Sequence, residues 1–305
     1  MDNSRLLAIL AAIGASTIYG VNHTLAKGLM PLYIEPFGFI LLRVTGAAIL
    51  FWIVSIFAPK EKIASQDWPR IIGCAIFGMV INMLFFFKGL SLSTPINSSV
   101  IITLSPVIVL ILASILIKER ITLLKTLGII IGMAGALVLV LFSKEENINA
   151  PNVPLGNILF IINAFSYGLY LILVKPLTKK YHAITLMKWL FLIAIFINLP
   201  ITYSEFMEVE WETLPFDAIW KMGFVVLGTT FMTYLLNIYA LKQLSAATIS
   251  AFIYLQPLIA ITFAIMVGAD KLNWTKGIAA TLVFIGVYMV SVKVKKKEKP
   301  VAEIK

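Results

Sequence analysis

Ten long apolar stretches follow one another along the 305-residue chain, and they constrain its fold more than any other feature. A helix needs about 20 mostly apolar residues to cross the hydrocarbon core of a membrane, and each stretch has roughly that length. Hydrophobic residues make up 60% of the chain and charged residues only 13%, whereas a soluble domain is nearer half apolar and a quarter charged. We therefore predict an all-α integral membrane protein with ten transmembrane helices. The predicted spans cover about 6–27, 36–57, 70–89, 95–117, 122–142, 155–175, 183–203, 217–240, 246–268 and 275–293.

The lysine and arginine residues between the apolar stretches predict the orientation of the chain in the membrane. With a cytoplasmic N-terminus, about seventeen of them fall in cytoplasmic segments and about five in outer ones, as the positive-inside rule requires. Both termini are then cytoplasmic, which agrees with an even number of spans. These loops explain the net charge of +10, so we expect no nucleic acid partner. We expect the protein in a bacterial inner (plasma) membrane.

The first predicted span carries polar residues that a membrane-crossing helix usually lacks. Tyr19, Asn22 and His23 share one face of a helix, because residues three and four apart are neighbours on its surface. Polar side chains in hydrocarbon are costly and usually face a protein interior or a water-filled cavity. This face therefore either lines a central cavity or makes a hydrogen bond with another helix, as polar residues in membranes often do.

The two halves of the chain share an internal repeat. Residues 89–122 align with residues 240–273 at an offset of 151. Each half holds five spans, and because five is odd the second half must enter the membrane in the opposite sense. We predict two inverted five-helix repeats, at 1–145 and at 146–305, the second with a basic cytoplasmic tail. Such repeats are typical of secondary transporters, whose site lies near the midplane between the repeats. The offset pairs Ser99 with Ser250, Leu104 with Leu255, Pro106 with Pro257, Glu119 with Asp270 and Gly135 with Gly286.

The chain resembles the EamA branch of the drug/metabolite transporter superfamily over roughly 6–293. The most specific element is the proline of the fourth and ninth spans (Pro106, Pro257), which precedes an acidic residue and then a Gly-rich span. Arg43 in the second span also fits the family's pattern, whereas the second half has Lys188 in a looser register. The resemblance implies a small-molecule transporter that works by alternating access and has no ATP site. It does not imply a particular substrate.

Polar and aromatic residues of several predicted spans are the candidate substrate-binding residues. Their donors and acceptors can replace the hydration shell of a substrate, although hydrogen bonds between helices would use the same groups. Pro106 and Pro257 free backbone carbonyls one turn earlier and can kink their helices, which suits gates that match between the halves. The candidate substrate-binding residues are Tyr19, Asn22, His23, Arg43, Asn82, Asn97, Ser98, Asn163, Tyr167, Asn237 and Tyr254.

Arg43 lies about seven residues into its span, so its side chain reaches the membrane surface only with difficulty. Its planar, permanently charged guanidinium can hold a carboxylate or phosphate group of a substrate with two hydrogen bonds. The alternative is a structural role, in which Arg43 pairs with Glu35 or with backbone carbonyls. The sequence leaves both alternatives open.

The carboxylates of the chain restrict how transport is driven, because no Asp or Glu lies well inside a predicted span. Proton or sodium coupling commonly uses such carboxylates, and His23 is the one group in a span whose ordinary pKa is near neutrality. Coupling therefore uses His23 or is absent, which leaves facilitated transport or exchange. Glu119 and Asp270 lie beside span ends, where we expect them to cap a helix or to pair locally with Arg120 and Lys271.

The leading functional hypothesis is a secondary transporter that exports small polar metabolites, such as amino-acid-like compounds or organic anions and zwitterions. A lipid flippase or scramblase of similar architecture is the alternative, and it would need a lateral opening between spans. A membrane-embedded enzyme is disfavoured because the two histidines, His23 and His182, fall at different depths, and because the single cysteine, Cys74, forms no metal site alone. We expect no catalytic residue, metal or cofactor. The expected partners are the substrate and membrane lipid, and the sequence does not indicate an oligomeric state.

Overall fold

The computed structural model describes residues 3–93, 95–141, 150–266 and 274–292 of the chain. Within these residues every regular element is a helix, so the prediction of an all-α protein is confirmed. Elements η1 and η4 are short 3₁₀ helices, and η2 and η3 are π-helices. The elements are α1 (Asn3–Lys27), α2 (Pro36–Val54), η1 (Ser65–Asp67), α3 (Trp68–Ala75), η2 (Ile76–Ile81), α4 (Asn82–Leu92), α5 (Pro95–Ile102), α6 (Ser105–Leu116), α7 (Leu123–Leu141), α8 (Val153–Thr178), α9 (Ala183–Met207), α10 (Phe216–Phe224), η3 (Val225–Met232), α11 (Thr233–Gln243), α12 (Ala246–Ala251), η4 (Phe252–Tyr254), α13 (Leu255–Met266) and α14 (Trp274–Ser291).

Ten helical segments of the described residues are long and apolar enough to cross a membrane, which confirms the predicted number of spans. The third and eighth each combine three elements, α3–η2–α4 and α10–η3–α11, and the fourth and ninth are each broken near their middle. Large apolar side chains such as Ile49, Phe196 and Phe284 are more than half exposed on the outer surface. Exposed apolar side chains of this kind are expected where helices face lipid, because the helix satisfies its own backbone hydrogen bonds.

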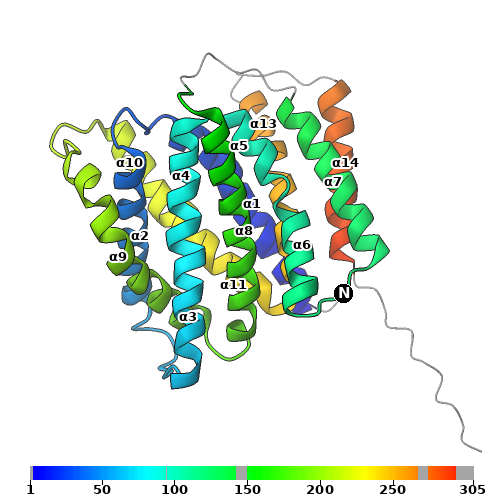
Figure 1. The fold of residues 1–305 in the computed structure, drawn as a ribbon, viewed down its shortest axis with the longest axis horizontal. Coiled ribbons are helices and arrows are strands. Elements are labelled where there is room, and N and C mark those ends of the chain that lie inside the picture. Colours follow the sequence, from blue (N-terminus) through cyan, green and yellow to red (C-terminus); the bar gives the residue numbers. More distant parts are fainter. Residues whose placement is uncertain (1–2, 94, 142–149, 267–273, 293–305) are drawn as a thin grey trace, which may run out of the picture.

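Successive spans run in alternating directions between the two ends of one bundle (Figure 1). We call the end at which α1 begins the near end and the opposite end the far end. The first half therefore starts at the near end with α1, and the second half starts at the far end with α8. This difference in direction is what a five-span repeat requires. The inverted relation of the halves and their division at 1–145 and 146–305 remain predictions.

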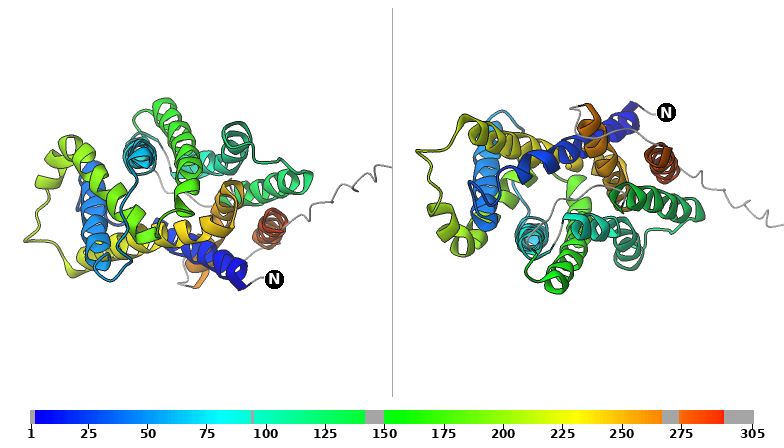
Figure 2. Two further views of the ribbon diagram at one scale, coloured as in Figure 1. Left: turned by 90° about the horizontal axis from the view of Figure 1, so that it is seen from below. Right: turned by 90° about the horizontal axis from the view of Figure 1, so that it is seen from above.

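The most extensive contacts between spans have counterparts when the two halves are exchanged. Span one packs on span eight (α1 on α11) and span six on span three (α8 on α4), and these two pairs are counterparts. Span six also contacts span four through α6, as span one contacts span nine through α13. The remaining pairs, α2 with α9 and α7 with α14, join equivalent spans of the two halves. Viewed from its ends, the bundle carries these two pairs on opposite sides (Figure 2).

Departures from α-helical geometry recur at matching positions of the halves. The π-helix η2 spans Ile76–Ile81, and its counterpart η3 spans Val225–Met232, which overlaps the first at the 151-residue offset. The fourth span is interrupted between α5 and α6, where the offset also places η4 of the ninth span. Pro106 lies in the first turn of α6 and Pro257 is the third residue of α13, where proline's missing N–H costs little. The predicted breaks at the two prolines are therefore present, and their role as gates remains a prediction.

Glycines bring the fifth and tenth spans into backbone contact. A Cβ atom added to Gly286 would lie 2.5 Å from the Cα atom of Gly132, and one added to Gly128 would lie 2.8 Å from the carbonyl oxygen of Gly286. Small residues allow such close approach, which is a common way of holding membrane helices together. The α7–α14 pair thus forms a compact unit at one side of the bundle (Figure 1).

Candidate functional site

A cavity of about 790 Å³ lies between the two halves of the chain, and both halves supply its walls. Its volume is in the range of small-molecule sites, which is roughly 300–1,000 Å³. Seven of the predicted residues line it, namely Tyr19, Asn22, Arg43, Asn82, Ser98, Asn163 and Tyr167. The other polar residues of the lining are Glu35, Ser91, Ser99, Ser105, Thr229, Tyr234 and Gln256.

The cavity runs from the far end of the bundle to its middle. Lining residues at the far end, among them Glu35, Ser91 and Pro151, are exposed. Lining residues in the middle of the spans are buried, with Arg43 7% and Ser105 2% exposed. The exposed rim at one end and the buried floor in the middle describe a site that is accessible from the far end.

Arg43 is held at the floor of this cavity by its Nε atom. This atom donates a hydrogen bond of 3.0 Å to the hydroxyl of Thr230, and that hydroxyl donates one of 2.9 Å to the carbonyl of Val225. The guanidinium carbon also lies 5.9 Å from the ring centre of Phe39 and 5.4 Å from that of Phe87, within the range of cation–π attraction. The side chain is thus fixed by contacts that leave its two terminal nitrogens without hydrogen bonds to the described residues.

No carboxylate of the described residues lies within ion-pair distance of Arg43. The alternative in which Arg43 pairs with Glu35 is therefore not what the structure contains, although both residues line the cavity. Glu35 lies just before the first turn of α2, at the rim, whereas Arg43 lies two turns deeper in the same helix. A buried cation without an ion-pair partner is costly unless water or a ligand compensates it.

The asparagines of the cavity also make hydrogen bonds between helices. Asn163 donates to the backbone carbonyl of Asn82 at 2.6 Å, and Asn82 donates to that of Asn163 at 3.4 Å. Asn22 accepts a hydrogen bond of 2.9 Å from the hydroxyl of Thr229. Cavity lining and interhelical bonding, which the sequence presents as alternatives, therefore occur together at these residues.

Aromatic rings form a large part of the remaining wall. Tyr19, Phe86, Phe87, Tyr167 and Tyr234 all line the cavity. The hydroxyl of Tyr234 donates to the carbonyl of Gly78 at 3.2 Å, within the π-helix η2. Such a wall offers contact to apolar or aromatic parts of a ligand, beside a cationic and amide-rich floor.

Several predicted residues lie outside the cavity. Asn97 lies beside the lining residue Ser98 and donates to Ser93 at 3.4 Å, near the far end. Asn237 lies one turn beyond the lining residue Tyr234 towards the near end, and the fully buried Tyr254 lies between the lining residues Ile253 and Gln256. The side chain of His23 lies outside the described residues. A role of these residues in binding remains a prediction.

Sequence reasoning missed other lining residues for identifiable reasons. Thr229 and Tyr234 belong to the same span as the predicted residue Asn237, and the sequence does not show at which depth of that span the cavity lies. Phe86 and Phe87 carry no signal that separates a cavity wall from a lipid-facing surface. Glu35 was considered only as a partner of Arg43.

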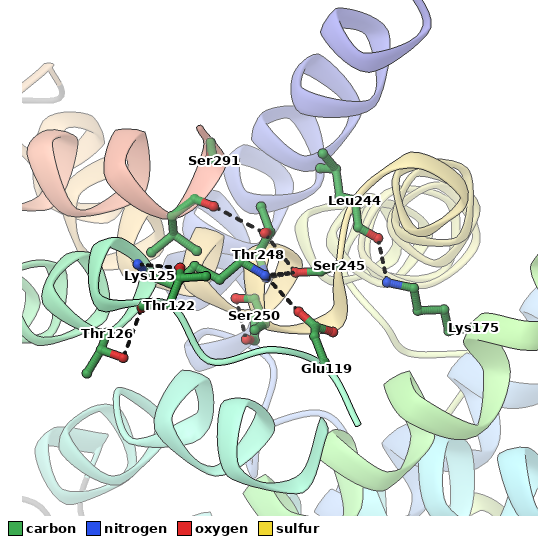
Figure 3. A network of polar contacts seen from close by, with 12 residues as sticks. Glu119, Thr122, Lys125, Thr126, Lys175, Leu244, Ser245, Thr248, Ser250 and Ser291 are labelled. Atoms are coloured by element: carbon green, nitrogen blue, oxygen red, sulfur yellow. Dashed lines mark hydrogen bonds and ion pairs between the residues drawn. The ribbon is translucent and has the colours of Figure 1, made fainter. Parts of the chain in front are cut away.

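A polar network closes the near end of the bundle (Figure 3). The ammonium group of Lys125 lies 2.8 Å from a carboxylate oxygen of Glu119 and donates to the hydroxyl of Ser245 at 3.3 Å. The predicted pairing of Glu119 with Arg120 is wrong. Lys118 has a φ of 51°, and Glu119 donates its N–H to the carbonyl of Ala113, so the chain reverses after α6 and carries Glu119 towards α7. Asp270 lies outside the described residues.

Metal binding has no visible basis in the described part of the chain, where no three His, Cys, Asp or Glu side chains gather. The one cysteine, Cys74, is buried. The charged and polar groups of the cavity can instead bind an organic ligand by hydrogen bonds and charge.

Comparison with known proteins gives a consistent result. The EamA-like transporter family matches residues 6–141 and 154–292. An uncharacterized transporter of Archaeoglobus fulgidus is 26% identical over 90% of this chain and 95% of its own length. The uncharacterized transporter YyaM of Bacillus subtilis is 24% identical over 92% of each chain. A WAT1-related protein of Arabidopsis thaliana is 22% identical over 92% of this chain and 84% of its own.

A solved crystal structure shares the fold. It covers 92% of this chain and 95% of its own with a TM-score of 0.75, at 16% sequence identity. At this identity the likeness extends to the fold alone. The arrangement of ten spans described above is therefore one that an experimentally determined protein also adopts.

Proposed function

Because the chain belongs to the EamA-like transporter family, we propose that it is a secondary transporter that moves small polar metabolites by alternating access. The family and the relatives make it a multi-pass membrane transporter with a small-molecule substrate. The finer statements, on substrate, direction and mechanism, are proposals. They rest on the cavity between the halves and on the residues that line it.

Arg43 is the observation that carries the proposed substrate class. It is a buried cation at the cavity floor with two terminal nitrogens free of described partners. In a low-dielectric interior such a charge favours an anionic group close to it, and a guanidinium binds carboxylate or phosphate through two parallel hydrogen bonds. We propose substrates that carry a carboxylate or a phosphate, including zwitterions such as amino-acid-like compounds.

Thr230 supports this role by orienting the guanidinium. Its hydroxyl receives the Nε–H of Arg43 and is itself held by the carbonyl of Val225. With Nε occupied, the terminal nitrogens are the ones available to a ligand. We propose that Thr230 is a positioning residue and that Asn82 and Asn163, which line the cavity, contact the rest of the substrate.

The proposed orientation places the near end in the cytoplasm of a bacterium, with both termini there. It rests on the excess of lysine and arginine in the near-end connections. The cavity is then accessible from outside the cell. We propose export as the physiological direction, with coupling through His23 or by exchange.

Lipid translocation is the competing function. It would require the cavity to open sideways between spans, whereas the exposed lining residues lie at the far end. A separate, wholly apolar groove of about 530 Å³ lies against α2 and α10 and shares no lining residue with the cavity. The structure therefore favours a soluble substrate over a lipid.

Reconstitution into liposomes tests the proposal. Purified protein is tested for movement of radiolabelled amino acids, carboxylic acids and phosphate monoesters, each beside its neutral amide or alcohol analogue. We expect saturable, protein-dependent movement of at least one anionic or zwitterionic compound and weaker movement of its neutral analogue. Movement of neutral compounds alone would contradict the proposed substrate class, and protein-dependent flipping of a fluorescent phospholipid would favour the lipid alternative.

A further inference from the structure

The half of the bundle between the cavity floor and the near end is sealed. In the ninth span, Ile253 is the lining residue nearest to the near end, and Ser245 begins the helix there. The eight steps from Ser245 to Ile253 correspond to about 12 Å of helix. The intervening side chains of α12 and η4 are almost fully buried, for example Ile249 at 3% and Phe252 at 2%. A ligand at the floor therefore has no route to the near end in this conformation.

Polar contacts close this half at its outermost point. Lys125, in the first turn of α7, bonds both Glu119 of the preceding connection and Ser245 of the second half. The side chains of Lys125 and Glu119 remain 17% and 13% exposed. Ser245 in turn accepts the N–H of Thr248 and so caps α12. The contact therefore joins the connection between spans four and five to the start of span nine.

A second contact lies beside the first. The ammonium group of Lys175, near the end of α8, donates to the carbonyl of Leu244 at 3.0 Å (Figure 3). Leu244 immediately precedes Ser245, so both lysines hold the same short connection between spans eight and nine. Partly exposed bonds of this kind exchange with water at little net cost, which makes them suitable for repeated opening.

Two tyrosine hydroxyls, one beside the cavity floor and one just beyond it towards the near end, have no hydrogen-bond partner among the described residues. They belong to Tyr170 and Tyr254, which are 2% and 0% exposed. Tyr170 lies one turn beyond the lining residue Tyr167 towards the near end, and Tyr254 lies at the level of the floor, between the lining residues Ile253 and Gln256. A buried hydroxyl without a partner is unfavourable. Water that enters from the near end would relieve this cost.

We infer that Lys125, Glu119, Ser245 and Lys175 form a latch that closes the near end, and that its opening exposes the cavity floor, beside Tyr254, by a route past Tyr170. The inference deepens the proposed function, since it rests on alternating access. The latch holds the conformation that is accessible from the far end. The unsatisfied tyrosine hydroxyls oppose it, so breaking the latch shifts the population towards a conformation accessible from the near end.

Cysteine labelling tests the latch without a known substrate. Cys74→Ser removes the native thiol, and Ser105→Cys places a reporter at the cavity floor. Ser65→Cys and Thr213→Cys, at exposed near-end and far-end positions, identify the two sides. A membrane-impermeant maleimide is applied to sealed vesicles of both orientations. With the latch intact, we expect the Ser105→Cys reporter to react from the far end only.

Latch variants should reverse this preference. We expect Lys125→Met, and the milder Glu119→Gln and Ser245→Ala, to raise labelling from the near end by about threefold or more and to reduce it from the far end. Lys180→Met is the matched control, because it breaks the ion pair of Lys180 with Asp67 at the same end. That ion pair lies beside α8 and α3, which already pack against each other, so its loss should not open the near end. If the folded Ser245→Ala and Glu119→Gln variants keep the wild-type sidedness, the inference is overturned.

A cross-link provides the opposite test. Cysteines at Lys125 and Ser245, joined by a short bifunctional maleimide, should keep the reporter reactive from the far end and abolish any reaction from the near end. Near-end labelling that persists after cross-linking would overturn the latch. The latch variants can change the labelling as expected while the protein moves none of the tested compounds in liposomes. That result would count against the proposed function and not against the latch, so failure of one is distinguishable from failure of the other.

Discussion

The carboxylate of Glu205 lies 2.6 Å from the backbone nitrogen of Phe37 and accepts its N–H. The same oxygen accepts the N–H of Gly38, so the end of α9 caps the start of α2 at the far end. At the near end Glu61, which follows α2, accepts the N–H of His182 at the start of α9. Each helix of the pair therefore has its N-terminus capped by a carboxylate from the C-terminal end of the other helix or from the connection that follows it. Such contacts at both ends favour movement of α2 and α9 as one body.

Loss of this cap should weaken the protein. Glu205→Gln retains an acceptor but removes the negative charge that favours a helix N-terminus, and Glu205→Ala removes the acceptor as well. We expect a loss of about 1 kcal/mol for Glu205→Ala and a lower apparent Tm by about 2 °C. The exposed Glu208→Ala at the same helix end is the control. Equal melting of the Glu205→Ala and Glu208→Ala variants in detergent would show that the cap contributes nothing.

Disruption of the glycine contact between α7 and α14 should lower the stability of the protein more. Gly286→Ala places a methyl group 2.5 Å from the Cα atom of Gly132, and the helices must separate to admit it. We expect a destabilisation of about 1–3 kcal/mol. Gly277→Ala lies on the same helix with no atom within 4 Å of the added group, and it should be neutral or stabilising because alanine favours helix over glycine. Size-exclusion profiles recorded after heating would measure both, and a Gly286→Ala variant as stable as Gly277→Ala would refute close backbone packing.

The orientation of the chain in the membrane is open to a direct test. The positive-inside rule predicts that a reporter fused after Lys144 is outside the cytoplasm and that one fused after Lys180 is inside it. Alkaline phosphatase and green fluorescent protein fusions report the two sides. The sixth span lies between the two fusion points. Finding both of them on one side would mean that this span does not cross the membrane, which would contradict the inverted-repeat prediction.

The number of spans and the helical class could be predicted because each depends on the length and apolarity of a segment, which the sequence displays directly. Whether a residue lines the cavity depends on its depth in the membrane as well as on the helix face that carries it. Tyr234 and Asn237 are one turn apart in α11, yet the cavity floor lies between them. Asn97 and Ser98 are adjacent, and only Ser98 faces the cavity. Amphipathic spacing contains no information on the level at which a cavity ends.

The sequence also does not predict which partners the charged side chains contact. Glu119 bonds Lys125 rather than its neighbour Arg120, because the left-handed backbone at Lys118 turns the chain. Arg43 takes Thr230 as its partner across 187 residues of sequence. Both choices are made by tertiary packing, and neither partner carries a pattern that would identify it in advance.

Substitution of Arg43 tests the proposed substrate charge. Arg43→Lys keeps the charge but loses the planar, two-pronged geometry, and Arg43→Gln loses both. Hydrogen bonds to charged groups are worth about 1.5–3 kcal/mol, so we expect the KM for an anionic substrate to rise about tenfold or more in Arg43→Gln and less in Arg43→Lys. The neutral analogue should be moved equally by all three proteins. A well-folded Arg43→Gln variant that transports anionic substrates normally would exclude a role of the arginine in binding.

Substitution of Thr230 tests the orientation of the Arg43 guanidinium without changing its charge. Thr230→Val keeps the side-chain shape but removes the hydroxyl that accepts from Arg43, so Nε loses its partner and the fork is free to turn away from the ligand. The charge of Arg43 stays in place and only its orientation is lost, so the KM for the anionic substrate should rise less than in Arg43→Gln, by about fivefold, which corresponds to ~1 kcal/mol. Thr230→Ser, which keeps the hydroxyl, should have the wild-type KM for the anionic substrate. Thr202→Val is the control, because it removes a buried hydroxyl in α9 that bonds only the carbonyl of Asn198.

The discriminating measurement for Thr230 is the ratio of KM values for an anionic substrate and its neutral analogue. A purely structural role would lower the amount of folded protein or raise both KM values together, as the Thr202→Val variant measures. A positioning role raises the KM of the anion alone and leaves that of the neutral compound in place. If Thr230→Val leaves the ratio unchanged, the two ring contacts with Phe39 and Phe87 are sufficient to orient Arg43, and the hydroxyl serves only the π-helix that contains it.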